Sequence, residues 1–187
     1  GSVSFNEASF FDSTQTPTFG FSPSAGNTVL HFNSGDGFVD GTAFVDTGLT
    51  FLEGTYIFSI DVSNFNNQPF PPTIINIRSG GSDINTLGSV VTADTINTPT
   101  PNPGDTETWT FTVTVPSGDP IIGQSVGFEF GVSSNPGVFE NVAFDNFQVE
   151  APNQTDLDQD GILNSQDSDS DGDGISDRDE IAIDAGH

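Results

Sequence analysis

A strict alternation of small polar and large apolar residues between residues 108 and 115 constrains the fold of this chain most. In an extended strand successive side chains point to opposite faces, so the threonines would line one face. The other face would gather Trp109, Phe111, Val113 and Val115. A face made only of large apolar side chains must be buried. The segment therefore predicts a β-strand with one face in a core and one toward solvent.

Similar short alternating stretches, separated by Gly, Pro, Asn and Asp, recur through the first 150 residues, and none of them is typical of a helix. Seven or eight such strands predict an all-β fold, an antiparallel β-sandwich of the jelly-roll kind. Two proline-rich segments, Asn64–Pro72 and Thr95–Asp105, are expected to be loops. The plainest strands are expected at Thr28–Phe32, Gly37–Val45, Gly54–Val62, Thr73–Arg78, Glu107–Val115, Ser125–Val132 and Val142–Val149.

The composition changes after a short polar hinge at Ala151–Gln154. We therefore expect a sandwich domain at residues 3–150 and a small, largely irregular C-terminal tail at residues 151–187. Gly1-Ser2 resembles a cloning scar, and no segment resembles a signal peptide or a membrane span. The chain is expected to be part of a larger secreted protein with covalently linked neighbouring domains.

The charge balance excludes several partners, because 27 acidic residues face only Arg78 and Arg178 and the chain has no lysine. Nucleic acids and anionic lipids both require basic surfaces, so neither they nor membrane insertion are expected. Anionic polysaccharides are disfavoured for the same reason, whereas neutral sugars and calcium remain. The chain has no cysteine and no lysine, and no carboxylate pair stands out, so we expect no enzymatic activity.

The acid-rich tail matches a calcium-loop template twice between Asp156 and Glu180. Such loops take oxygen ligands from the first, third, fifth, seventh, ninth and twelfth positions and place glycine sixth, where the chain turns sharply. Gly161 and Gly174 fill the sixth positions. The first loop would use Asp156, Asp158, Asp160, the carbonyl of Ile162, Asn164 and Asp167. The second would use Asp169, Asp171, Asp173, the carbonyl of Ile175, Asp177 and Glu180.

A third register that starts at Asp167 is rejected, because its twelfth residue is Arg178. The alternative to calcium binding is a solvated acidic linker, which is what charge runs usually are. The two loop sequences resemble thrombospondin type 3 repeats. That resemblance implies a calcium-wrapped spacer outside the cell, in which Asp167 or Asp169 is shared between two ions. Without calcium the carboxylates repel one another, so we expect a disordered tail.

The sandwich segment resembles jelly-roll carbohydrate-binding modules and galactose-binding-type domains of exported bacterial proteins. The motifs that carry this resemblance are Phe5-Asn6-Glu7, Gly48-Leu49-Thr50 with Gly54–Ser59, the Trp109 strand and Phe144–Phe147. It implies a structural calcium held by Glu7 and Asp145, with Asp12, Asp36 or Asp61 as further ligands. The alternative is that Asp145 only turns the chain and Glu7 is solvated.

Sugar binding commonly uses an exposed aromatic platform. The single Trp109 and the single Tyr56 lie in expected strands, which favours a place in the core for both. Phenylalanines in loop-like segments are the substitute candidates, namely Phe11, Phe19, Phe21 and Phe70. Arg78 would either clamp a hydroxyl pair or carboxylate of a ligand, or pair with one of the many acids.

Two functions follow from these features. The first is a non-catalytic, extracellular carbohydrate-binding module that binds a neutral polysaccharide and carries a calcium-stabilised spacer. The second is a cell-surface adhesin or structural spacer without a small-molecule ligand. The second function would use a flat exterior such as the threonine row from Thr108 to Thr114.

Overall fold

The computed structural model describes residues 2–5, 8–12, 28–33, 41–65, 69–82, 85–133, 141–152, 169 and 174–176. Contacts divide the chain into two units, residues 1–150 and 151–187. The described part of the first unit forms strands and contains no helix. These are β1 (Ser2–Phe5), β2 (Ala8–Asp12), β3 (Thr28–Asn33), β4 (Gly41–Thr50), β5 (Gly54–Asn64), β6 (Thr73–Ser79), β7 (Ser89–Val91), β8 (Thr95–Asn97), β9 (Thr106–Val115), β10 (Ser125–Val132) and β11 (Asn141–Glu150).

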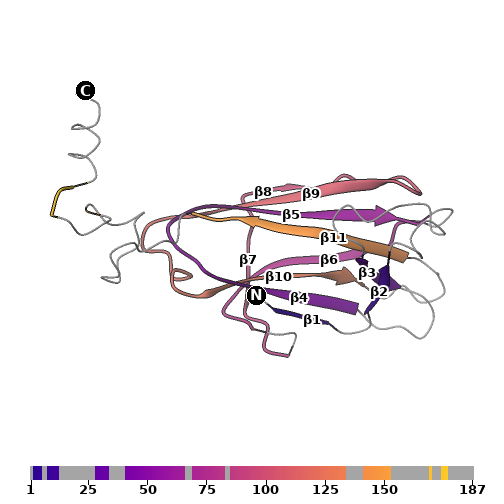
Figure 1. Cartoon of the computed structure of the whole chain (residues 1–187), viewed down its shortest axis with the longest axis horizontal. Coiled ribbons are helices and arrows are strands. Elements are labelled where there is room, and N and C mark those ends of the chain that lie inside the picture. The colour runs from indigo at the N-terminus through magenta and orange to yellow at the C-terminus, as the bar shows by residue number, and fades with distance from the viewer. Residues whose placement is uncertain are drawn as a thin grey trace, which may run out of the picture. The chain divides into compact units, whose positions relative to one another are not determined.

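The strands form two antiparallel sheets that stack face to face, as Figure 1 shows for β9, β5 and β11 in one layer and β6, β10 and β4 in the other. Sheet A has the order β1-β4-β10-β6-β7, and sheet B has the order β2-β3-β11-β5-β9-β8. The expected all-β antiparallel sandwich is confirmed. Within the described ranges, the chain also offers no helix with the length and apolar character that a bilayer crossing requires.

Each of the seven expected strands has a counterpart, but four short strands were not foreseen: β1, β2, β7 and β8. The loop expected at Thr95–Asp105 was wrong over its first three residues, since β8 pairs there with β9. Strands of three to five residues show too little alternation to be recognised. Their extended form depends on hydrogen bonds to a neighbouring strand, which the sequence does not reveal.

Aromatic rings from both sheets fill the space between them. Phe128 of β10 stacks on Phe58 of β5 at a centroid distance of 5.8 Å and on Phe147 of β11 at 4.8 Å. Trp109 and Phe111 on β9 are 3% and 4% exposed, so the apolar row of that strand is in the core as expected. Burial of large apolar area between two sheets supplies the main stabilisation of such a fold.

On the outer face of sheet A, the ring of Phe44 on β4 lies against Gly127 on β10. A Cβ atom on Gly127 would lie 2.3 Å from Cζ of Phe44. Phe44 is fully buried, so its ring has little room to move. The close contact between the two strands therefore requires glycine at position 127.

We expect Gly127→Ala to lower the free energy of unfolding by about 1–3 kcal/mol, because the added methyl group overpacks a filled site. Chemical denaturation monitored by Trp109 fluorescence measures this change. In a Phe44→Leu background the smaller side chain makes room, so Gly127→Ala should cost less there. An equal cost in both backgrounds would show that the Phe44 ring is not what excludes a side chain at residue 127.

Candidate functional site

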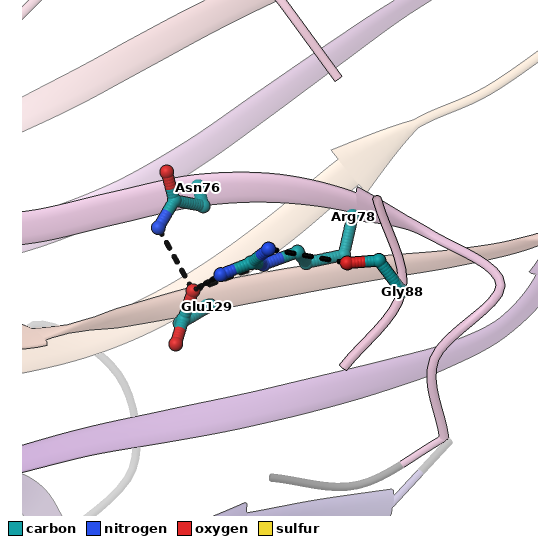
Figure 2. Close-up of polar contacts among 4 residues, drawn as sticks. All are labelled: Asn76, Arg78, Gly88 and Glu129. Atoms are coloured by element: carbon teal, nitrogen blue, oxygen red, sulfur yellow. Dashed lines mark hydrogen bonds and ion pairs between the residues drawn. The ribbon is translucent and has the colours of Figure 1, made fainter. Parts of the chain in front are cut away.

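A polar cluster lies on the outer face of sheet A, where Asn76 and Arg78 of β6 meet Glu129 of β10. The strand register pairs Glu129 with Asn76 and Gly127 with Arg78, which places all three side chains on one face. Asn76 Nδ2 donates to Glu129 Oε2 at 2.8 Å, and Arg78 Nε donates to the same oxygen at 3.0 Å. Arg78 Nη2 forms an ion pair with that oxygen as well (Figure 2).

The fourth contact of the cluster connects it to the segment before β7. Arg78 Nη1 donates to the carbonyl oxygen of Gly88 at 3.1 Å. Gly88 itself packs tightly, since a Cβ atom there would lie 1.8 Å from the carbonyl oxygen of Ser79. Arg78 is thereby fixed by a carboxylate on one side and by a backbone carbonyl on the other.

Burial makes the ion pair necessary. The side chains of Arg78 and Glu129 are 17% and 7% exposed, and a carboxylate removed from water to this degree needs a charged or hydrogen-bonded partner. Of the two roles considered for Arg78, the structure shows pairing with an acid. The three contacts with Glu129 all end on its Oε2 atom, and Figure 2 shows Oε1 pointing away from Arg78 and Asn76.

Sequence reasoning missed Glu129 and Asn76, although a signal for Glu129 was present. Glu129 stands between Phe128 and Phe130, and its outward-facing neighbours along β10 are Gly127 and Gly131. The acid therefore has a glycine as its outward neighbour on each side, and the residues between them are inward aromatics. Such a pattern indicates an isolated polar side chain on the outer face of a strand.

The expected aromatic platforms do not join this cluster. Tyr56 is fully buried, and its hydroxyl donates to the carbonyl oxygen of Thr50 at 3.0 Å. Trp109 is 3% exposed and donates from Nε1 to the carbonyl oxygen of Pro99 at 2.8 Å. Both belong to the core, as favoured from the sequence.

The outcome differs among the phenylalanines expected as substitute platforms. Phe70 is half-buried and meets Trp109 edge to face at 5.8 Å. Phe70 precedes β6, whereas Arg78 lies near the far end of that strand, roughly 17 Å from its first residue, Thr73, at 3.3 Å per residue. The structure thus does not bring Phe70 to Arg78. Phe11 was expected in a loop but lies in β2, and Phe19 and Phe21 lie outside the described residues.

Two aspartates lie opposite each other on the outer face of sheet B. Asp145 of β11 pairs in register with Asp61 of β5, just before a bulge in β11. Asp61 is 6% exposed and accepts hydrogen bonds from Thr108 Oγ1 at 2.5 Å and from Asn146 Nδ2 at 3.0 Å. Asp145 Oδ1 accepts the backbone N–H of Asn146 at 2.8 Å, and Asn146 has a φ of 49°. Asp145 therefore shapes the local turn.

The calcium ligands expected in the sandwich are tested only partly by this geometry. Glu7 lies outside the described residues, and the last strand, β11, has β3 and β5 as its neighbours rather than the first strand. Among the residues that the structure describes, no three His, Cys, Asp or Glu side chains gather around a metal position. Asp61 and Asp145 together offer part of the six to eight oxygens that calcium takes.

In the tail, the structure describes four residues of the expected second loop, namely Asp169, Gly174, Ile175 and Ser176. Asp169 Oδ2 accepts the backbone N–H of Gly174 at 2.9 Å, and Gly174 has a φ of 90°. Ile175 is described as well and is 40% exposed. The other expected ligands lie outside the described residues, namely Asp156, Asp158, Asp160, Ile162, Asn164, Asp167, Asp171, Asp173, Asp177 and Glu180.

No protein-family model matches the sequence, and no curated protein matches it either. Among solved structures, a Stig cyclase from Fischerella sp. TAU, bound to a methylpyrrolidinylidene-indole, is similar with a TM-score of 0.51 and 16% identity. The match covers 67% of this chain and 64% of the cyclase, so the chain spans less than two thirds of that enzyme. At this identity the similarity shows a shared fold alone.

Binding and adhesion domains are also similar at lower scores. A CBM4 carbohydrate-binding module has a TM-score of 0.44 and 13% identity, over 80% of this chain and 94% of the module. The K1 cleaved adhesin domain of Lys-gingipain from Porphyromonas gingivalis W83 has a TM-score of 0.40 and 11% identity, over 81% and 99% of the two chains.

A buried histidine also lies on the outer face of sheet B. His31 of β3 is 9% exposed, its ring lies 5.2 Å from that of Phe65, and Nε2 donates to Asn141 Oδ1 at 2.7 Å. Burial lowers the pKa of His31 below its ordinary value, although the hydrogen bond that His31 donates to Asn141 acts in the opposite direction. His31 is thus held in its neutral form within the fold.

Because the folded-state pKa of His31 lies below the unfolded value of 6.5, its contribution to stability is complete above that pH and is lost as the pH falls through it. We expect His31→Gln, which retains an N–H donor without a titrating group, to flatten the fall in unfolding free energy between about pH 7.5 and 5.5. Urea denaturation at several pH values measures this. An unchanged slope would mean that other groups cause the dependence.

Proposed function

We propose that this chain is a non-catalytic, extracellular carbohydrate-binding module that binds a neutral polysaccharide on the outer face of sheet A. The observation that carries the proposal is the cluster of Asn76, Arg78 and Glu129, in which donors and an acceptor are fixed by one another before any ligand arrives. Fixed polar groups reduce the entropy lost on binding. The similarity to binding and adhesion domains is consistent with this role.

The chemistry of the cluster suits sugar hydroxyl groups. A hydroxyl both donates and accepts, so it can pair with the guanidinium of Arg78, the amide of Asn76 and the carboxylate of Glu129. The charges of Arg78 and Glu129 cancel, so the cluster attracts neither anions nor cations strongly. The chain as a whole has a net charge of −25 and repels anionic polymers. A neutral polysaccharide is the ligand class that remains.

The same ion pair argues against catalysis at this site. A glycoside hydrolase needs a carboxylate that exchanges a proton and a second carboxylate at a defined separation. Glu129 Oε2 is instead occupied by hydrogen bonds from both Arg78 and Asn76. The cluster is built to hold a ligand rather than to transform it.

The test is binding to a panel of neutral polysaccharides, including β-glucan, xylan and mannan, by isothermal titration and by retention on the insoluble forms. We expect saturable binding to at least one polymer, weakened about 3- to 10-fold by Asn76→Ala, which removes one hydrogen-bonding amide. Asn76→Ala leaves the ion pair of Arg78 and Glu129 in place, so the fold should persist. Thr112→Ala on the outer face of sheet B is the matched control and should bind like the parent chain.

The second candidate function is an adhesin or spacer without a small-molecule ligand. It is favoured by the outward threonines of β9, which are exposed or half-buried while the alternate residues are buried. Failure of every polymer in the panel to bind, or equal binding by Asn76→Ala and the parent, would contradict the sugar site. Either result would leave this alternative.

We further propose that calcium stabilises the tail as an extracellular spacer that leads to neighbouring domains. The support is the hydrogen bond from Gly174 to Asp169 together with the positive φ of Gly174, since these residues occupy the first and sixth positions of the expected loop. A loop that wraps a cation turns sharply at its sixth residue, and glycine adopts that conformation without strain.

We expect calorimetric titration of the chelated chain to show calcium uptake by the tail at about 10⁻⁴ to 10⁻³ M, as in other extracellular modules. Asp169→Asn should weaken it, because a charged ligand is lost. Glu53→Gln removes one negative charge from an exposed residue between β4 and β5 and serves as the control. If both variants bind calcium equally well, the loop assignment is wrong and the tail is an acidic linker.

A further inference from the structure

A cavity of about 230 Å³ opens at one edge of the sandwich, between the last strands of the two sheets. Ile75 and Ile77 of β6 line it from sheet A, and Phe111 of β9 lines it from sheet B. The edge strands β7 and β8 contribute Val90 and Ile96. Each of these edge strands ends its sheet, so no further strand among the described residues covers the gap between them.

The cavity has a buried floor and an apolar mouth. Ile77 and Phe111 are 3% and 4% exposed, whereas Val90 and Ile96 are 54% and 64% exposed. These two are among the few large apolar side chains that the described part of the chain exposes, and both lie at this cavity. Exposed apolar side chains next to a preformed apolar cavity are typical of a ligand site.

The cavity also differs from the rest of the chain in charge. None of the described residues that line it is charged, and its polar members are Asn76 and Thr92. The chain around it has a net charge of −25. An anionic ligand would be repelled by that field and would lose its hydration without gaining a cation. The volume is below the roughly 300–1,000 Å³ of sites for drug-sized ligands, so the ligand must be small.

We propose that this cavity binds a small, uncharged molecule with an apolar body and a hydroxyl end, such as a short alkyl alcohol. The apolar body contacts Ile77, Ile96 and Phe111, while Thr92 offers a hydrogen bond to the hydroxyl group. Ile75 and Ile77 face the cavity from the inner side of β6, whereas the polar cluster lies on the outer side of that strand, so this site does not depend on polysaccharide binding.

The test uses the full chain, with 1-hexanol as the probe and hexanoate as its charged counterpart, followed by methyl and backbone NMR shifts. We expect saturable shifts centred on Val90, Val91 and Ile96 with 1-hexanol. Hexanoate should bind at least about 10-fold more weakly, because its carboxylate would have to leave water near an acidic chain. Equal binding of the two probes would overturn the proposal, as would shifts that do not saturate.

Two matched substitutions locate the site. Ile96→Thr reduces the apolar mouth and should weaken 1-hexanol binding about 5-fold, in line with the apolar area lost. Ile57→Thr changes an exposed isoleucine of β5 that does not line the cavity, and it should leave binding unchanged. Both residues are exposed, so neither change should unfold the chain. Equal effects of the two variants would show that the probe binds elsewhere and would refute the assignment.

Discussion

The contact between the two aromatic inner faces is the interaction on which the rest of this structure depends. Phe128 lies at its centre, with Phe58, Phe111 and Phe147 of sheet B within 6 Å of its ring centroid. The chain has no cysteine, so no disulfide bond can support the fold. Stability must come from burying these rings, and every strand in the two layers is oriented by the need to direct its apolar side inward.

That requirement also determines what the outer faces can do. Once the even-numbered residues of β10 point inward, its outward positions after Ser125 are occupied by two glycines and Glu129. The glycines let β4 approach closely, and Glu129 forms an ion pair with Arg78 on β6. The polar cluster is therefore a consequence of the core, because the same strand that carries Phe128 inward presents Glu129 outward.

The strands with long alternation could be predicted from the sequence, and β9 shows why: its threonines and apolar residues alternate without interruption. The pairing between strands could not be predicted from the sequence. Arg78 was recognised as unusual because it is one of only two basic residues, yet its partner depends on the register of β6 against β10. Likewise Asp61 was one of three equal candidates beside Asp145 until the register of β5 and β11 placed them opposite each other.

The bulge in β11 adds one polar residue to the outer face of sheet B. Between Asp145 and Gln148 the strand has three residue steps, whereas its partner β5 has two between Asp61 and Ser59. One residue is therefore supernumerary, and without Asn146 both Phe144 and Phe147 would still face inward by simple alternation. Asn146 is therefore not required for the inward orientation of these two rings. What it alone supplies is an amide directed at Asp61 and a left-handed turn that gives Asp145 a backbone N–H. The extra residue thus provides contacts to the two carboxylates on the outer face rather than packing in the interior.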